Sequence, residues 1–287
     1  MSVATGRRVL STVMIGLLSG AELAHAQLPL NIEELLVAPR TINLQTLFAY
    51  TIVDQALPLL FAGGTGSGGS LPPAAEHQTR AATALTRIRY GLHQDIEVNA
   101  SFAHTQVDWQ QPGFAGGGNE HAATLGANWR VSADAETPAL LLTAGVDVLE
   151  TSWQVPQARW YGRTLRVGAQ TYRALDPVVL SLALLYEWRR ERDIGQVRYD
   201  PGDILRLQPQ VNFAVNHRVT LIGGLSWQYA QADRAGGLRT AVSRYQTDVS
   251  FGIGLQTGPG SVLFVDTRVA TSGGRGASVA LDWHYQF

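Results

Sequence analysis

The sequence contains no cysteine and only 16% charged residues, and these two shortages exclude several classes of protein. Without cysteine there is no disulfide scaffold and no thiolate zinc site. The formal net charge is −1, so the chain lacks the basic excess of a nucleic-acid-binding surface, and we expect no nucleic-acid partner. The low charge is combined with 7 Trp, 9 Tyr and 8 Phe, which argues against intrinsic disorder.

Long hydrophobic runs are also missing. The apolar stretch Val9–Leu18 is shorter than the roughly 20 residues that a membrane-spanning helix needs. It follows Arg7 and Arg8 and precedes the small-x-small site Ala24-His25-Ala26, so residues 1–26 are predicted to be a cleaved signal peptide. Beyond residue 26 no apolar run is long enough for a membrane helix. The chain is therefore expected to be exported, either to the periplasm or into the outer membrane as a β-barrel.

The last stretch of the chain alternates strictly between apolar and polar residues. A strand with large apolar groups on one face and charges on the other suits an oily exterior and a wet interior. The ending on an aromatic residue resembles the assembly signal of outer-membrane barrels, although a strand of a soluble sandwich would alternate in the same way. The five residues of the expected signal are Val279, Leu281, Trp283, Tyr285 and Phe287.

Twelve segments of period two follow one another from residue 40 onward. Each is about 11 to 18 residues long, enough for a tilted strand to cross a bilayer in about 9–11 residues and longer than the usual soluble strand of about 5–6 residues. The segments are 40–54, 79–92, 96–110, 120–133, 139–153, 164–175, 178–192, 204–215, 218–231, 240–257, 261–271 and 277–287.

The connections between these segments alternate between long and short. The longer ones are 55–78, 111–119, 154–163, 193–203 and 232–239, and tight turns such as Asp176-Pro177 lie between them. Outer-membrane barrels have short periplasmic turns, longer external loops and an even number of strands. We therefore predict an all-β fold: a transmembrane antiparallel β-barrel of about 12 strands over residues 40–287, in a bacterial outer membrane. Residues 27–39 are expected to be a short periplasmic segment or a small plug.

Aromatic residues gather near the expected strand ends, as in the girdles at membrane interfaces. Two irregularities are also expected. Pro209 lies mid-strand and removes a ladder donor, which predicts a bulge or local break, and Val107 is out of phase with Phe102, which predicts a bulge in the third strand. The external girdle would hold Tyr50, Trp153, Trp188, Trp227, Tyr229 and Tyr245, and the periplasmic girdle Tyr90, Trp129, Phe213, Tyr285 and Phe287.

Ionisable residues fall on the opposite, inward faces. Buried charges must be paired or hydrated. These residues therefore either stabilise the lumen as a ladder of salt bridges or form a selectivity lining. Arginine is in excess, which would mildly favour anionic or polar solutes. Twelve strands lie between filled 8-stranded and open ~16–18-stranded barrels, so a narrow or gated channel is expected. The candidate pore-lining residues are Arg87, Arg89, Glu97, Arg130, Asp147, Arg166, Glu187, Arg189, Arg206, Arg244, Asp248, Asp266, Arg268, Asp282 and His284.

Several strand-and-turn phrases resemble the outer-membrane transporter family named for the meta-pathway of phenol degradation. They are the phrases 90–97 (YGLHQDIE), 138–148, 175–180 with Tyr186, and 212–218 (NFAVNHR). The resemblance covers roughly residues 40–287 and implies a channel that passes small solutes, among them hydrophobic or aromatic compounds. The family also includes channels that export functional-amyloid subunits, which is the first alternative function. Those exporters carry a long coiled-coil region before the barrel, and here only residues 27–39 precede it.

An outer-membrane lipid-modifying enzyme and a purely structural barrel are the remaining alternatives. Barrel lipases activate a serine with a histidine in a His-x-Ser pair, and none of the seven histidines has Ser at that spacing. No two histidines have metal-ligand spacing. We therefore expect no catalytic residues, no metal and no cofactor. For a structural barrel, the Gly-rich stretch 63–70 is the candidate partner surface. The expected partners are outer-membrane lipid and lipopolysaccharide, the barrel-assembly machinery, and further copies of the chain in a homotrimer.

Overall fold

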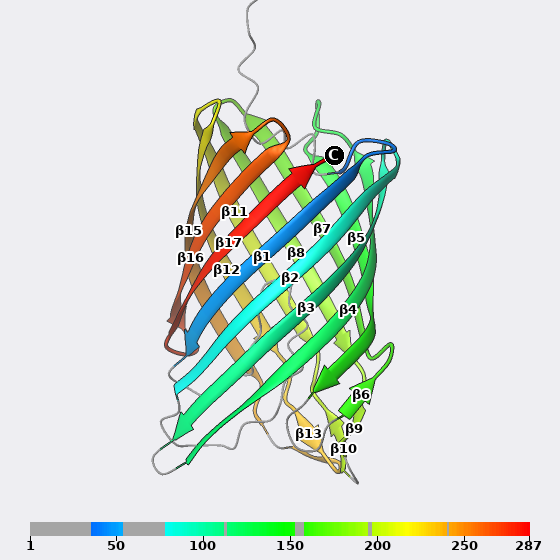
Figure 1. The fold of residues 1–287 in the computed structure, drawn as a ribbon, viewed down its shortest axis with the longest axis vertical. Coiled ribbons are helices and arrows are strands. Elements are labelled where there is room, and N and C mark those ends of the chain that lie inside the picture. The colour runs from blue at the N-terminus through cyan, green and yellow to red at the C-terminus, as the bar shows by residue number, and fades with distance from the viewer. Residues whose placement is uncertain (1–35, 54–77, 112–113, 153–157, 195–196, 240) are drawn as a thin grey trace, which may run out of the picture.

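A computed structural model describes residues 36–53, 78–111, 114–152, 158–194, 197–239 and 241–287. The expected signal peptide, most of the segment 27–39, the Gly-rich stretch 63–70 and Trp153 lie outside these residues. Figure 1 shows a single barrel of strongly tilted strands. Its long strands are β1 (Ile42–Val53), β2 (Gln78–His93), β3 (Ile96–Gln111), β4 (Phe114–Ser132), β5 (Ala139–Ser152), β7 (Thr164–Leu175), β8 (Val178–Arg189), β11 (Ile204–Asn216), β12 (Val219–Ala230), β15 (Arg244–Gly258), β16 (Ser261–Ser272) and β17 (Gly276–Gln286).

These twelve strands form one closed antiparallel sheet, which confirms the predicted fold. Each strand pairs with the next long strand along the chain, and β1 pairs with β17 over eleven registered residues to close the barrel. The additional pairing of β4 with β5 completes the ring. Closure leaves no free sheet edge, which is what a sheet in lipid requires. Among the described residues no helix is long and apolar enough to cross a membrane.

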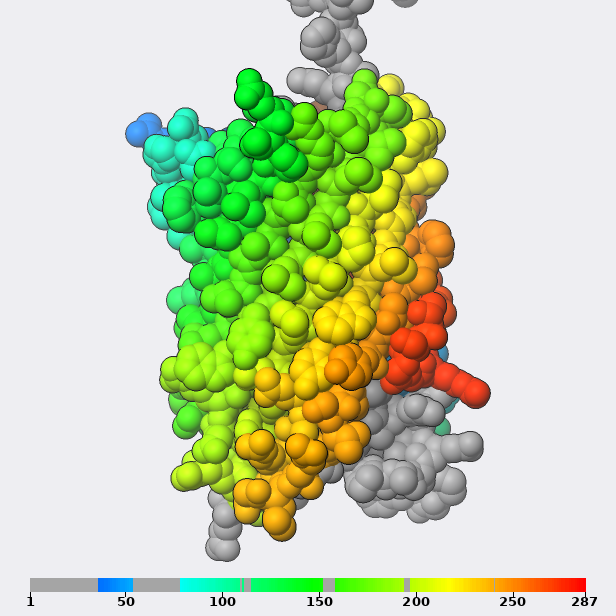
Figure 2. All heavy atoms as spheres, turned by 180° about the vertical axis from the view of Figure 1, so that it is seen from behind, coloured from blue at the N-terminus to red at the C-terminus, as the bar shows by residue number. Residues whose placement is uncertain are grey.

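Alternation along each strand separates two faces. The outer face carries the large apolar groups, such as Phe48, Phe102 and Phe251, which are half exposed or more. Seen from behind, side chains cover the wall continuously from the green strands to the orange ones (Figure 2). The described girdle residues follow the expected pattern, because Trp188 and Tyr245 project outward near one end and Trp129 and Phe213 near the other. The tilted ring contacts of Tyr245 with Trp227 and Tyr229 join three members of the first girdle.

The two ends of the barrel differ. Tight turns such as 94–95, 176–177 and 217–218 lie at the end that also holds the C-terminus (Figure 1). In the turn after β11, the Asn216 side-chain oxygen accepts hydrogen bonds from the backbone N–H groups of Arg218 and Val219. Short turns face the periplasm in outer-membrane barrels, so this end is called the periplasmic end and the opposite one the external end.

The external end carries structure that the sequence pattern did not predict. Four short strands form a second sheet there, and β6 pairs antiparallel with the external end of β5. The stretches 154–163, 193–203 and 232–239 were therefore wrongly predicted as loops throughout. The prediction of a connection over 111–119 was wrong as well, because β4 begins at Phe114. The short strands are β6 (Ala158–Trp160), β9 (Arg192–Ile194), β10 (Val197–Asp200), β13 (Arg234–Ala235) and β14 (Leu238–Arg239).

One of the two expected irregularities is present. The ladder between β11 and β12 has no registered pairs at Gln208 and Pro209, which confirms a local break at the proline. The bulge expected in the third strand is wrong, because β3 keeps one register against β4 throughout and Val107 simply faces the lumen, where it is buried. A bulge lies instead between β4 and β5. There Thr124 pairs with Asp147 and Ala123 with Leu149, which leaves Val148 as the extra residue.

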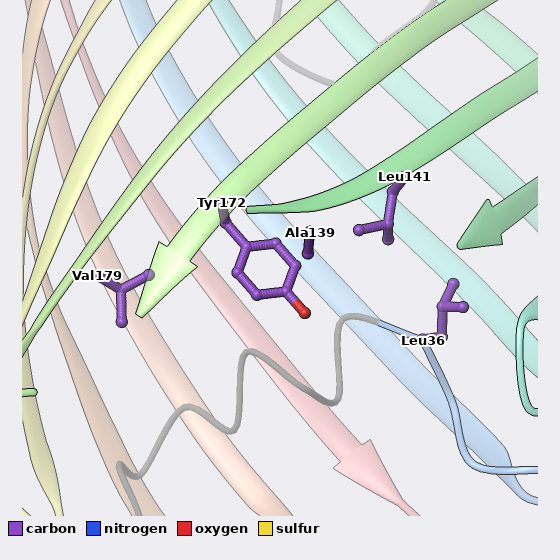
Figure 3. Close-up of a cluster of buried hydrophobic side chains, with 5 residues drawn as sticks. All are labelled: Leu36, Ala139, Leu141, Tyr172 and Val179. Atoms are coloured by element: carbon purple, nitrogen blue, oxygen red, sulfur yellow. The ribbon is translucent and has the colours of Figure 1, made fainter. Parts of the chain in front are cut away.

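The first described residues lie against the inside of the barrel wall at the periplasmic end. Leu36 packs with Ala139, Leu141, Tyr172 and Val179, all inward-facing residues of β5, β7 and β8 (Figure 3). The backbone then passes β2 so closely that a Cβ on Gly91 would stand 2.2 Å from the Ala38 carbonyl oxygen. Only glycine fits at this crossing. The contact ties the start of the described chain to the barrel wall.

Candidate functional site: the barrel lumen

A buried charge network at the periplasmic end joins three strands to the N-terminal segment. Glu97 of β3 is fully buried and accepts two hydrogen bonds from Arg89 of β2, at 2.8 and 2.6 Å. Asn128 of β4 and the backbone N–H of Val37 each donate to the same carboxylate at 2.9 Å. Four donors satisfy one buried carboxylate, so this part of the predicted lining is structural.

A second network runs along β4, β5, β7, β8 and β11. Asp147 is fully buried, holds both terminal nitrogens of Arg166 and accepts a hydrogen bond from Thr124 at 2.6 Å. Glu187 lies between two arginines, with Arg166 Nε and Arg206 Nη2 each 3.9 Å from its Oε1. Arg206 in turn donates to the Gln228 side chain of β12. Because these charges hold one another, they brace the wall.

A third chain of contacts crosses β2, β1, β17 and β16. Arg87 donates to Gln45 at 3.2 Å, and Gln45 donates to Asp282 at 2.8 Å. The Nε2 atom of His284 lies 3.2 Å from the same Asp282 oxygen, and its ring meets Phe264 edge-on at 5.3 Å. His284 and Asp282 keep 25% and 18% of their side-chain surface in contact with solvent. This chain is therefore in contact with solvent at its β17 end, whereas the carboxylates of the two networks above are fully or almost fully buried.

The neighbouring strands β15 and β16 carry the charges with the fewest partners. Asp248 accepts one hydrogen bond, from Gln246 at 2.8 Å. Among the described residues Arg268 makes neither a hydrogen bond nor an ion pair, although Asp266 and Arg206 lie within electrostatic range of it. A guanidinium in this state must be hydrated or must meet a passing anion.

Two inward glycines of β15 leave room for side chains of β16 to lie along the wall. A Cβ on Gly252 would stand 2.1 Å from the Asp266 Oδ1 atom, and one on Gly254 would stand 2.9 Å from the Phe264 ring. The side chains of Asp266 and Phe264 therefore lie over the glycines, along the wall.

Solvent contact in the lumen is uneven. On β16 and β17 the inward residues from Val262 to Ala270 and from Ser278 to Gln286 all remain partly exposed. On β2 the inward run Thr79, Ala81, Thr83 and Leu85 is buried. On β15 the inward residues from Gln246 to Gly252 are also partly exposed, whereas Gln45 and Thr51 on the inward face of β1 are buried. The wetter wall is thus the one formed by β15, β16 and β17.

Three predicted lining residues lie at the ends of the barrel. Arg130 donates to Asp95 and to the Gln94 carbonyl of a periplasmic turn. Arg189 donates to the carbonyls of Pro201 and Gly202 and is 4% exposed, so it lies beneath the external structure.

Arg244 is the third of these residues, and it lies 3.5 Å from Asp233 at the external end. Burial raises the pKa of Asp233. Tyr199, which donates a hydrogen bond to Asp233 at 3.2 Å, also has a raised pKa, from burial and from the aspartate charge. The three side chains fix the second sheet to the barrel rim.

Sequence reasoning missed one inward pair. Glu150 and Arg192 form a buried ion pair beneath Trp160, and Thr164 donates to Glu150 at 2.6 Å. Strict alternation from Asp147 would point Glu150 toward lipid. The bulge at Val148 reverses that direction, and nothing in the residue pattern marks it, because Val148 and Leu149 are both apolar.

No set of three or more His, Asp or Glu side chains that could hold a metal ion is found in the part of the chain that the structure describes. The lumen charges are paired with one another or solvated. Their arrangement can therefore hold the wall together and select solutes by charge.

No protein-family model matches the sequence, and no curated protein matches it. Solved structures match the fold. An outer-membrane channel from Pseudomonas putida F1 is similar with a TM-score of 0.66 at 13% identity, over 88% of this chain and 97% of that one. The translocator domain of the autotransporter NalP from Neisseria meningitidis is similar with a TM-score of 0.56 at 12% identity, over 91% and 94% of the two chains. The chain therefore has the fold of outer-membrane channels and translocator barrels.

Proposed function

We propose that the protein is a channel of the bacterial outer membrane that passes small anionic or polar solutes. The observation that carries the proposal is the wetter wall of β15, β16 and β17, where the lining keeps solvent contact and Arg268 has no partner among the described residues. The likeness to an outer-membrane channel supports the fold that such a function needs. The resemblance of the strand-and-turn phrases to the phenol meta-pathway transporters supports the same class of function.

The guanidinium of Arg268, which has no partner among the described residues, is the feature of the lining that favours anions. The predicted lining holds eight arginines (87, 89, 130, 166, 189, 206, 244 and 268) and six acids (97, 147, 187, 248, 266 and 282), but Arg130, Arg189 and Arg244 lie at the ends of the barrel against acids or carbonyls. Glu97, Asp147 and Glu187 are buried against arginines. The chain contains no lysine, and a guanidinium stays charged over the whole physiological pH range. A ring or wall of arginines is the usual device of anion pores.

Reconstitution in planar bilayers tests this proposal. The purified protein should give discrete conductance steps, and the reversal potential in a salt gradient should indicate anion preference. Arg268→Glu should shift the reversal potential toward cation preference, because it replaces a solvated positive charge of the lining by a negative one. Absence of conductance steps from folded protein would refute the channel function.

A matched control separates charge in the lumen from charge elsewhere. Arg173 is bonded to Asp134 and the Ala135 carbonyl at a periplasmic turn, and Arg173→Glu should leave the reversal potential unchanged. Both variants should keep the heat-modifiable mobility of a folded barrel. An equal shift in the two variants would show that the charge of the lining is not what selects the solute.

A further inference from the structure

A row of polar side chains crosses the outer wall of the barrel near the external end. His104 of β3 is registered opposite His121 of β4, His121 opposite Thr151 of β5, and Thr151 opposite Arg159 of β6. Registered partners share a face of a sheet. The chain neighbours Ala103, Ala122 and Glu150 are buried toward the lumen. The row of His104, His121, Thr151 and Arg159, here called the outer-wall patch, therefore faces away from the lumen.

The patch lies at the boundary of the apolar band. One row nearer the periplasm, the same strands present Phe102, Ala123 and Leu149, and Phe102 is 50% exposed. One row farther out, Gln106 is registered opposite Asn119. Apolar side chains thus give way to polar ones at the patch itself. In an outer membrane this is the depth at which the headgroups of the outer leaflet meet their acyl chains.

The chemistry of the patch is that of an anion site. The Nδ1 atoms of His104 and His121 are hydrogen-bonded at 3.1 Å, and Phe102 stacks on His121 with ring centroids 5.8 Å apart. The Thr151 hydroxyl is buried and has no hydrogen-bond partner among the described residues. Arg159 is exposed beside it. A buried hydroxyl without a partner costs free energy unless a ligand or water satisfies it.

We propose that the outer-wall patch binds a phosphate group of the lipid A portion of lipopolysaccharide. Arg159 supplies the planar guanidinium that pairs with phosphate, while the histidine pair and the Thr151 hydroxyl supply further hydrogen-bond donors on the same row. Phe102 and the other members of its apolar row, Ala123 and Leu149, contact an acyl chain. A lipid fits better than a free ion because charged and apolar contacts lie side by side at the headgroup level. The site is on the outside of the barrel and is independent of the channel function.

Native mass spectrometry of the full mature chain in detergent tests the proposal. Bisphosphorylated lipid A should bind at least about tenfold more tightly than the same lipid with its phosphates removed. Arg159→Gln combined with His104→Gln should reduce this preference to within about threefold. Thr151→Val, which keeps the side-chain shape and removes the hydroxyl, should weaken phosphate-dependent binding on its own.

Arg198→Gln combined with His217→Gln is the matched control, because Arg198 lies in the external sheet and His217 in a periplasmic turn. It removes the same two side-chain types away from the patch and should bind lipid A as the unaltered protein does. Binding that does not depend on the phosphates would overturn the proposal. Equal binding by the patch variants and the control would overturn it as well, and heat-modifiable mobility shows that each variant is folded.

Discussion

Replacing Glu97 by glutamine tests the buried network that joins β2, β3 and β4 to the N-terminal segment. The carboxylate is 0% exposed and accepts from Arg89 twice, from Asn128 and from the Val37 backbone. Glutamine keeps the shape, but its amide nitrogen is itself a donor. One side of the group would then place a donor against donors, and the charge opposite Arg89 would be lost.

The expected loss of stability follows from the hydrogen bonds and the ion pair that the Glu97 carboxylate makes. Hydrogen bonds to charged groups contribute about 1.5–3 kcal/mol each, and removing one partner of a buried ion pair costs about 3–5 kcal/mol. Arg89 keeps 15% of its side-chain surface exposed, so water can partly hydrate the unpaired guanidinium. We therefore expect Glu97→Gln to lower the free energy of unfolding by about 3 kcal/mol.

Urea unfolding in phospholipid vesicles, followed by tryptophan fluorescence, measures that loss. Glu191→Gln is the control, since its side chain is 58% exposed and faces Arg198 in an open ion pair. Its effect should stay within about 0.5 kcal/mol. Amide exchange at Val37 should also accelerate in Glu97→Gln. A loss below about 1 kcal/mol, with unchanged exchange at Val37, would refute the view that Glu97 anchors both Arg89 and the N-terminal segment.

Three further predictions concern other parts of the barrel. Gly252→Ala should change single-channel conductance and lower anion preference, because its Cβ would turn the Asp266 carboxylate into the lumen; unaltered channels would contradict this. The external sheet should pack most firmly below the ordinary aspartate pKa and loosen as pH rises through the raised pKa of Asp233. Amide exchange in the external sheet, corrected for its intrinsic pH dependence, should become faster over this pH range, and Asp233→Asn should abolish the change. Slower exchange at high pH would contradict the predicted direction. Deletion of Phe287, which is 71% exposed, should reduce assembly in cells far more than spontaneous folding into vesicles, and an equal loss in both would argue against an assembly signal.

The twelve strands could be predicted because lipid outside and water inside impose period two over the full thickness of the membrane. The register was harder to predict. The three glycines 116–118 were predicted to lie in a loop. They belong to β4 because β3 continues beside them and provides hydrogen-bond partners. Val107 read as lipid-facing because it is apolar, whereas it is buried inside the wall. Near a barrel end an apolar residue can face either the lumen or the lipid, so its hydrophobicity does not predict its direction.

The partners of the lumen charges could not be predicted, because they depend on which strands lie side by side. Alternation placed Arg166 and Asp147 on the inward face, but only the register of β5 against β7 brings their side chains together. The missed pair of Glu150 and Arg192 depends on the bulge at Val148. One extra residue turns Glu150, which strict alternation would point toward lipid, into a buried partner of Arg192.

That bulge also explains why the lumen has two unlike sides. By turning Glu150 inward beneath the external strands, it extends the charge network of β5, β7 and β8 toward the external end, where Arg192 and Arg189 are buried. The opposite wall has no such cover in the described residues, and its inward glycines hold Asp266 and Phe264 flat. One half of the sheet is therefore stabilised by paired charges, and the other half is in contact with solvent. A solute that crosses the barrel should follow the wetter half, so substitutions there should alter selectivity, whereas those on the braced half should alter stability.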